Sequence, residues 1–269
     1  MHNINKIAAV ALTAFSLLAI APAANASLIG LYTYNNASNL GLDSSGKGNN
    51  LVNSGSTAAT IGVYGGGLNL NGGSALLAAS GTLAGLPTGD SSYTITSWIN
   101  PTVSGIGGVV GWGNYFANNQ VVAFRMNGDN SMHNYWWAND LTATVSTNLA
   151  AGDGADGWHF VAATYDAASH FEAIYIDNVL VSSRFAWDLN AQGMNFAVGK
   201  TVGDEYFNGQ MDNTAIFNQS LSASQLLTVS RNDFSAFGVN AVPEPTSLLL
   251  LAIGAAAAVG ARRRSKRVV

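Results

Sequence analysis

Short apolar runs, separated by clusters of Gly, Asn, Asp and Ser, fill the middle of the chain and constrain its fold more than any other feature. The chain contains 30 glycines and few runs with the spacing of an amphipathic helix. The expected strands cover residues 29–34, 67–70, 93–99, 109–112, 121–126, 158–165, 172–176, 179–182, 195–198 and 210–217. Many short strands at this spacing predict an all-β sandwich or barrel.

Two local signals add detail to this prediction. Asp177 and Asn178 separate two expected strands, and both residue types tolerate a positive φ, so a two-residue β-hairpin is predicted there. One short C-terminal helix is predicted after Ser222, because Ser222 and Gln225 have the spacing of a capping box.

Residues 1–26 have the three-part pattern of a secretory signal peptide. Lys6 precedes an apolar run over residues 7–20, and an A-x-A site ending at Ala26 follows. We expect signal peptidase to cleave after Ala26. The alternatives are a membrane anchor and a buried helix, and the shortness of the apolar run disfavours the anchor.

Residues 242–269 combine three further features. Pro243, Glu244 and Pro245 form an extended, accessible segment, because proline cannot continue a preceding element. The uncharged run 248–261 would span only about 21 Å as a helix, less than the roughly 30 Å of hydrocarbon in a bilayer. A cluster of Arg and Lys ends the chain and is expected to stay in the cytoplasm. The apolar run is therefore marginal as a permanent anchor.

This order of Pro-Glu-Pro, short apolar helix and basic end resembles the PEP-CTERM sorting signal of Gram-negative bacteria. The resemblance implies a transient association with the inner membrane, followed by cleavage by an exosortase that recognises residues 243–245. It also implies a final place at the cell surface or in the extracellular matrix of a cell that makes exopolysaccharide. An ordinary tail anchor is the alternative.

Five motifs follow one another through the middle of the chain. They are Leu-Tyr-Thr-Tyr at 31–34, Gly-Leu-Asp-Ser-Ser-Gly at 41–46, Tyr-Thr-Ile-Thr-Ser-Trp at 93–98, Trp-His-Phe-Val at 158–161 and Asn-Gly-Gln-Met-Asp-Asn at 208–213. Their order resembles that of the LamG-like, concanavalin A-like jelly-roll domains. The resemblance implies a two-sheet antiparallel β-sandwich over residues 27–241, with hydrophobic targeting helices at both ends of the precursor.

The segment between the two ends is acidic. Residues 27–241 hold five basic and fourteen acidic residues, for a net charge of −9. Such a surface repels phosphate backbones, so we expect no nucleic-acid partner. The absence of cysteine excludes disulfides, thiolate metal sites and a cysteine nucleophile. Divalent cations and neutral polysaccharides suit this chain better.

Catalytic motifs are not recognisable in the sequence. Glucanases that share the jelly roll carry carboxylates at alternate positions of one strand, and this chain has no such triple. Outside the tail, the only possible glutamate pair is Glu172 with Glu205. His133 and His170, which we expect in loops, and His159 at a strand start match no nucleophile or metal motif. We therefore expect a protein that is not an enzyme, with a glycoside hydrolase as an alternative.

Two aspartates are candidates for a structural Ca²⁺ site. Jelly rolls of the resembled type often use one acid from an early Asp-x-Ser-Gly turn and another from a late Gly-x-x-Asp strand. Asp43 and Asp212 occupy these positions, and carboxylate oxygens are preferred calcium ligands. The alternative is that both carboxylates only accept local hydrogen bonds.

Aromatic and amide side chains provide candidates for carbohydrate binding, because sugar rings pack on aromatic faces and sugar hydroxyls bind polar groups. The candidates are Trp112, Tyr115, Tyr135, Trp136, Trp137 and Asn139. Trp136 and Trp137 are adjacent, so they would face opposite sides of a regular strand and only one would reach a ligand. The alternative is that these aromatic residues only complete the core.

These observations favour an exported surface or matrix protein whose lectin-like jelly roll binds polysaccharide or another surface protein. A purely structural matrix module without a small ligand is one alternative, and a glycoside hydrolase is the other.

We expect the exported protein to begin at Ser27, because the A-x-A site ends at Ala26. Intact-mass measurement of the exported protein checks this expectation. Ala26→Phe should block cleavage, since the peptidase accepts small residues at that position. A wild-type protein that still begins at Met1 would contradict the prediction.

Overall fold

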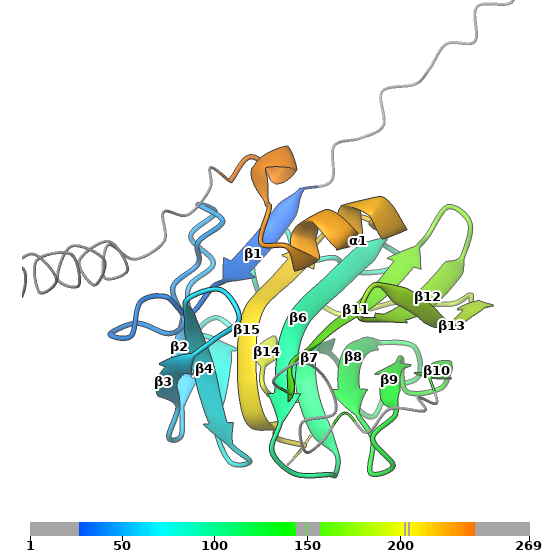
Figure 1. The fold of residues 1–269 in the computed structure, drawn as a ribbon. Coiled ribbons are helices and arrows are strands. Elements are labelled where there is room, and N and C mark those ends of the chain that lie inside the picture. The colour runs from blue at the N-terminus through cyan, green and yellow to red at the C-terminus, as the bar shows by residue number, and fades with distance from the viewer. Residues whose placement is uncertain (1–26, 144–148, 150–156, 202, 204, 240–269) are drawn as a thin grey trace, which may run out of the picture.

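The structure is a computed structural model, which describes residues 27–143, 149, 157–201, 203 and 205–239. Two antiparallel sheets pack face to face (Figure 1), which confirms the predicted sandwich. Each of the ten expected strands is present, with small differences in length. The predicted signal peptide, the predicted sorting tail and the hydrophobic helices expected in them lie outside the described residues.

The first sheet has eight strands. Their order is β13 (Val179–Phe185), β12 (Phe171–Ile176), β11 (His159–Asp166), β6 (Tyr93–Pro101), β15 (Asn208–Phe217), β4 (Gly66–Asn71) and β3 (Ala58–Ile61), and β1 (Leu28–Tyr32) also pairs with β15. Neighbouring strands that are far apart in sequence, such as β6 and β15, hold the two halves of the chain together.

The second sheet has seven strands. Their order is β10 (Asp140–Ala143), β9 (Met132–Tyr135), β8 (Val121–Met126), β7 (Gly107–Gly113), β14 (Ala197–Val198), β5 (Ala75–Ala78) and β2 (Leu51–Ser54). The sequence did not predict β2, β3, β5, β9 and β10. Each has four residues, and several are rich in Ala, Ser or Asn. These strands therefore form because they pair with a neighbouring strand, not because their residues prefer the extended conformation. His133 therefore lies on β9, and its predicted loop position is wrong.

The hairpin and helix predictions are confirmed. Asp177 and Asn178 join β12 to β13 with φ values of 50° and 65°, as a two-residue turn with two positive φ angles requires. Helix α1 (Ala223–Ser230) begins after Ser222, whose hydroxyl accepts from the Gln225 N–H while the Gln225 side chain accepts from the Ser222 N–H.

The main core lies between the two sheets and contains large aromatic side chains. Trp112 on β7 and Trp136 after β9 are fully buried there. The Trp112 indole N–H donates to the Pro87 carbonyl at 3.0 Å, and that of Trp136 donates to the Tyr93 hydroxyl at 3.0 Å. Both large rings are thus buried without an unpaired indole donor.

A second apolar cluster covers the outer face of the eight-stranded sheet. Leu226 and Val229 of α1 pack with Phe160 and Phe217, and the 3₁₀ turn η2 (Ser235–Phe237) adds Phe237, whose ring centroid lies 4.8 Å from that of Phe217. Figure 1 shows α1 lying across this sheet. No helix of the described residues lies on the outer face of the seven-stranded sheet, where Tyr115 and Trp137 pack over Val121 and Ala123.

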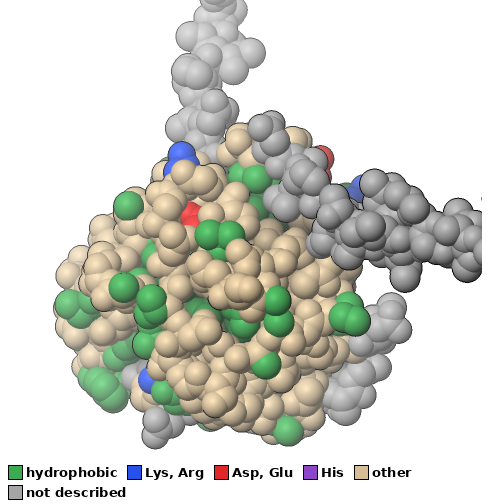
Figure 2. Space-filling view, turned by 90° about the vertical axis from the view of Figure 1, so that its left-hand side faces the viewer, with side chains coloured by type: hydrophobic (Ala, Val, Ile, Leu, Met, Phe, Trp, Pro, Cys, Tyr) green, Lys and Arg blue, Asp and Glu red, His purple; other side chains and the backbone are tan. Residues whose placement is uncertain are grey.

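The side of the molecule near β2, β3 and β4 faces the viewer in Figure 2. Its hydrophobic side chains form small, separate groups among polar atoms, with few charged side chains between them. In the part of the chain that the structure describes, no helix is long and apolar enough to cross a membrane.

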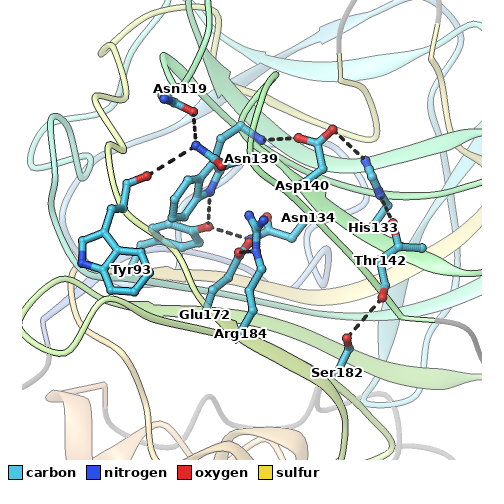
Figure 3. A network of polar contacts seen from close by, with 12 residues as sticks. Tyr93, Asn119, His133, Asn134, Asn139, Asp140, Thr142, Glu172, Ser182 and Arg184 are labelled. Carbon is cyan, nitrogen blue, oxygen red and sulfur yellow. Dashed lines mark hydrogen bonds and ion pairs between the residues drawn. The ribbon is translucent and has the colours of Figure 1, made fainter.

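Two buried carboxyl groups tie distant elements together. Glu172 on β12 is fully buried between the sheets, where it accepts from the Asn134 amide at 2.7 Å and from Arg184 Nε at 2.7 Å (Figure 3). Asp212 on β15 accepts backbone N–H groups of Tyr64 at 2.8 Å and Asn213 at 2.7 Å. Burial raises the pKa of each carboxyl group to about 7, against the opposing effect of these hydrogen bonds.

The raised pKa of Glu172 predicts a stability that depends on pH. The folded state holds the proton more tightly than the unfolded state, so this stabilisation is complete below about pH 4.5 and is lost as the pH rises through about 7. We expect Glu172→Gln to gain stability relative to the wild type between pH 5 and pH 8, by on the order of 2–3 kcal/mol. Urea unfolding at both pH values measures the difference.

Asp233→Asn is the matched control, because Asp233 is fully exposed and should leave the difference between pH 5 and pH 8 unchanged. A Glu172→Gln variant whose stability relative to the wild type is the same at both pH values would contradict the prediction.

Candidate functional site

The side chains of β9 divide between the core and the outer face of the seven-stranded sheet. Asn134 and Trp136 point inward, toward Glu172 and Tyr93. His133 and Tyr135 point outward, because successive residues of a strand face opposite sides. Trp137 follows the strand in a left-handed conformation and lies on the same outer side. The polar and aromatic segment 133–137 therefore contributes Asn134 and Trp136 to the core, and His133, Tyr135 and Trp137 to the outer face of the sheet.

The outward side chains form a continuous row of rings. The centroids of His133 and Tyr135 are 5.4 Å apart, those of Tyr135 and Trp137 are 6.3 Å apart, and those of Trp137 and Phe116 are 4.9 Å apart. Phe116 comes from the loop between β7 and β8 and is 76% exposed. We call these four residues the aromatic row.

A depression of about 280 Å³ lies beside the aromatic row. Its walls are Arg125, His133, Tyr135, Trp137, Asp140 and Glu205. The guanidinium carbon of Arg125 lies 4.8 Å from the centroid of the Tyr135 ring, and Arg125 also forms an ion pair with Glu205. Glu205 accepts further hydrogen bonds from the Tyr135 hydroxyl at 3.2 Å and from Thr201 Oγ1 at 2.5 Å.

Electrostatics keep the aromatic polar groups of the depression neutral near pH 7. Burial lowers the pKa of His133, and the positive charge of Arg125 lowers it further. Burial raises the pKa of the Tyr135 hydroxyl, and the charge of Glu205 adds to this shift. The depression thus offers a neutral imidazole and a phenol beside the Arg125–Glu205 pair, an assortment of donors and acceptors that suits a polar, uncharged ligand.

Two residues of the aromatic row have an unfavourable backbone conformation. Phe116 has φ 70° and Trp137 has φ 80°, a region that bulky side chains seldom occupy. Such a conformation costs on the order of 1–2 kcal/mol for each residue. The surrounding structure holds both residues in this strained backbone conformation at the point where their rings meet. Backbone strain of this kind is common at ligand-binding sites.

The structure brings together only part of the predicted carbohydrate site. Trp137 lies at the depression partly exposed, and Tyr135 lines it with only 4% of its surface exposed, beneath the Arg125 guanidinium group. Trp112 and Trp136 are fully buried in the main core, so they are wrong as surface ligand residues: Trp112 occupies an inward position of β7, and Trp136, directly after β9, packs against Tyr93 and Tyr165. Adjacency predicted that only one of the two tryptophans would reach a ligand, without saying which, and in the structure Trp137 is the one that is partly exposed.

Tyr115 and Asn139, the other two predicted carbohydrate-binding residues, do not line the depression beside the aromatic row. Tyr115 is half-buried next to Val121, and its hydroxyl group is buried without a hydrogen-bond partner among the described residues. Asn139 donates to the Asn119 side chain at 2.8 Å and to the Trp187 carbonyl at 3.5 Å (Figure 3). Asn139 therefore holds the turn after β9 against neighbouring loops.

Phe116, Arg125 and Glu205 belong to the site but were not among the residues that the sequence predicted for it. Arg125 pairs with His133 across the β8–β9 hairpin, so the strand register would have found it. Glu205 comes from the segment between β14 and β15, and no local signal in the sequence connects it with β9.

The two glutamates of the hydrolase alternative do not face one cleft. Glu172 binds Asn134 on the inner side of β9, whereas Glu205 binds Tyr135 on the outer side. Because Asn134 and Tyr135 are consecutive residues of one strand, the seven-stranded sheet lies between the two carboxyl groups.

The predicted calcium ligands hold separate loops. The Asp43 carboxylate accepts backbone N–H groups of Leu31 at 3.1 Å, Ser45 at 2.9 Å and Asn49 at 2.9 Å. Asp212 binds the backbone near Tyr64, as described above. Among the residues that the structure describes, no group of three or more His, Asp or Glu side chains is arranged to hold a metal ion. Calcium binding stays a prediction.

Comparisons with known proteins agree with this architecture. The family model described as the concanavalin A-like lectin/glucanases superfamily matches residues 70–227, which is more than half of the chain. The chain belongs to this superfamily. The PEP-CTERM protein-sorting motif matches residues 241–264, which confirms the resemblance of the tail and indicates export and sorting in Gram-negative bacteria. The comparison with curated proteins found no match.

Solved structures of similar fold include domain 4 of AbnA, an extracellular arabinanase from Geobacillus stearothermophilus, in complex with arabinotriose. It is 21% identical with a TM-score of 0.55, and the match covers 76% of this chain and 98% of that domain. The binding domain of botulinum neurotoxin serotype D is 15% identical with a TM-score of 0.56, and the match covers 76% of this chain and 52% of that one. At these identities the similarity shows the fold alone.

We expect Asp43→Asn to destabilise the protein by about 1–2 kcal/mol, because an amide nitrogen would replace one acceptor oxygen that faces backbone N–H groups. Thermal unfolding in excess Ca²⁺ and in chelator measures the loss. An equal loss in both conditions supports the loop role. A loss confined to Ca²⁺ would contradict it and support the calcium prediction.

Proposed function

We propose that this chain is an exported surface or matrix protein whose jelly roll binds polysaccharide at the aromatic row. The observation that carries the proposal is the aromatic row itself, together with the depression of about 280 Å³ beside it. Aromatic faces pack against the C–H face of a sugar ring, and Arg125, Asp140 and Glu205 provide hydrogen-bonding groups at the edge of such a ring.

The backbone strain at Phe116 and Trp137 supports this reading. If Phe116 and Trp137 only completed the core, nothing would require their left-handed conformations at the surface. A platform that stacks on a sugar does require both rings at one place. The solved domain in complex with arabinotriose adds support at the level of fold, since it presents the same type of sandwich to a sugar.

The sorting tail supports a role outside the inner membrane. We propose that an exosortase removes the tail at residues 243–245, after signal peptidase has removed residues 1–26. The released jelly roll would then act in an exopolysaccharide matrix or at the cell surface. The opposite faces occupied by Glu172 and Glu205 favour binding without hydrolysis.

We expect Trp137→Ala to weaken glycan binding by about tenfold or more, equivalent to about 1.4 kcal/mol, because the substitution removes the ring at the centre of the platform. A glycan array with the exported protein identifies ligands, and calorimetric titration compares the variants. Thermal unfolding checks that the variant remains folded.

Trp187→Ala is the matched control, since Trp187 is also exposed, at 54%, and stacks on Phe185 rather than on the aromatic row. Equal losses in both variants would contradict the assignment of the site. An array without any glycan ligand would contradict the proposed function and favour a structural module or a protein partner. Release of reducing sugar from a bound glycan would favour the hydrolase.

A further inference from the structure

One end of the sandwich is built from an uncharged stretch of the chain. No Asp, Glu, Lys, Arg or His occurs between Lys47 and Asp90, and this stretch includes β2, β3, β4 and β5. β2 and β3 are the last strands of their sheets, and the short connection over residues 55–57 places them at the same end of the molecule (Figure 1). We call the surface formed by residues 51–61 the neutral end.

The opposite end of the sandwich has features that keep a free strand edge from pairing. β13 and β10 are the last strands there, and Ser182 Oγ of β13 donates to the Thr142 carbonyl of β10 at 3.2 Å. A bulge interrupts the pairing of β13 with β12 between Ile174 and Tyr175, and the exposed Asp140 begins β10. Bulges, charges and cover are common means by which proteins prevent edge-to-edge association.

The edge strand β3 has none of these features. It consists of Ala58, Ala59, Thr60 and Ile61, without proline or charge, and its register with β4 is regular. Both alanines are exposed, and Ile61 is 83% exposed, more than any other large hydrophobic side chain in the described part of the chain. No strand among the described residues pairs with the outer edge of β3. Such an edge is a template for another strand.

The backbone of β3 directs hydrogen-bonding groups to the outside. The Gly62 N–H donates to the Gly65 carbonyl at 2.9 Å, so Gly62 turns its backbone groups toward the neighbouring β4. Successive residues of a strand direct these groups to opposite edges. Ala59 and Ile61 therefore point their N–H and C=O groups away from β4.

The charge of the protein favours a second copy of the chain as the partner of this edge. Residues 27–241 carry a net charge of −9, so most approaches between two copies bring like charges together. This repulsion is weakest at the neutral end, and a strongly basic partner finds no opposite charge there. Two antiparallel copies of one strand edge, related by a twofold axis, also present the same groups to each other.

We propose that two copies of the exported protein associate through β3, in antiparallel pairing about a twofold axis at Thr60. Ala59 of one copy then exchanges both backbone hydrogen bonds with Ile61 of the other, and the two side chains come into contact on one face of the sheet. Thr60 lies opposite Thr60 of the second copy. The two eight-stranded sheets thus become one continuous sheet.

The small size of this interface sets its strength. β3 has four residues, and the neighbouring Val52 on β2, which is 49% exposed, adds apolar surface to the neutral end. Small interfaces, below about 1,200 Å², are typical of weak association. We expect a dissociation constant on the order of 10–100 µM.

The proposed interface leaves the aromatic row free. β9 lies near the end of the seven-stranded sheet that is opposite to β2. A dimer therefore carries two copies of the row at its far ends, and if the row binds polysaccharide as proposed above, one dimer connects two polysaccharide chains. The association itself does not depend on that function.

Analytical ultracentrifugation of the exported protein, from about 1 to about 500 µM, measures the association. Ile61→Lys should weaken it by about tenfold or more, because it removes an apolar contact and adds like charges where the two copies meet. Val179→Lys is the matched control, since Val179 is also exposed, at 62%, and lies on β13 at the opposite end of the same sheet. The control should change the dissociation constant less than about twofold.

A second variant tests the backbone hydrogen bonds. Ala59→Pro removes an N–H group that points away from β4, so it should weaken the association by about tenfold while the bonds between β3 and β4 remain. Thermal unfolding checks that each variant remains folded.

A cysteine cross-link tests the register. The chain contains no cysteine, so Thr60→Cys introduces a single thiol. In the proposed dimer the two Thr60 residues form a non-hydrogen-bonded pair with Cα atoms about 4.5 Å apart, a distance that a disulfide can span. On mild oxidation, Thr60→Cys should form a disulfide-linked dimer about tenfold faster than Val179→Cys.

Three results would overturn the inference. The first is a wild-type protein that stays monomeric at every concentration measured. The second is an association that Ile61→Lys leaves unchanged, or that Val179→Lys weakens equally. The third is a Thr60→Cys variant that cross-links no faster than Val179→Cys. None of these results bears on the proposed function, because Trp137→Ala and the glycan measurements test the aromatic row at the other end of the molecule.

Discussion

The alternation of side chains along β9 determines both the interior and the surface of this protein. Asn134 and Trp136 enter the space between the sheets, where they bind the buried groups of Glu172 and Tyr93. His133 and Tyr135 take the opposite positions and form the aromatic row together with Trp137, directly after the strand, and Phe116. A shift of the register by one residue would exchange the two sets, so the pairing of β9 with β8 maintains core and site together.

The two outer faces of the sandwich have different roles because, in the described part of the chain, a helix covers only the face of the eight-stranded sheet. Helix α1 and the turn η2 bury the outer face of the eight-stranded sheet with Leu226, Val229 and Phe237. On the outer face of the seven-stranded sheet, Tyr115 and Trp137 pack over the small residues of β7 and β8, and the aromatic row lies at one end. The eight-stranded sheet therefore contributes to stability on both sides, whereas the seven-stranded sheet presents a surface to the outside.

The burial of Glu172 and Asp212 has a desolvation cost, because a carboxyl group loses its hydration in the interior. Glu172 lies between the sheets beside Arg184, and Asp212 lies under the backbone of the Tyr64 loop. Each group connects segments that are distant in sequence and would leave unpaired donors if it were removed. In this protein, which has no disulfides, such polar ties supplement the packing of the apolar core.

The sequence by itself determined the features that depend on local patterns of residues. Short apolar runs between turn residues predicted the sandwich, Asp177–Asn178 predicted the hairpin, Ser222 with Gln225 predicted the capping box, and the tail motif predicted sorting. Only the tertiary structure decided which aromatic residues reach the surface and which partners they meet. Trp112 and Trp136 enter the core, while Arg125 and Glu205 join Tyr135. The physical reason is that register and long-range pairing, which no local pattern encodes, set the facing of each side chain.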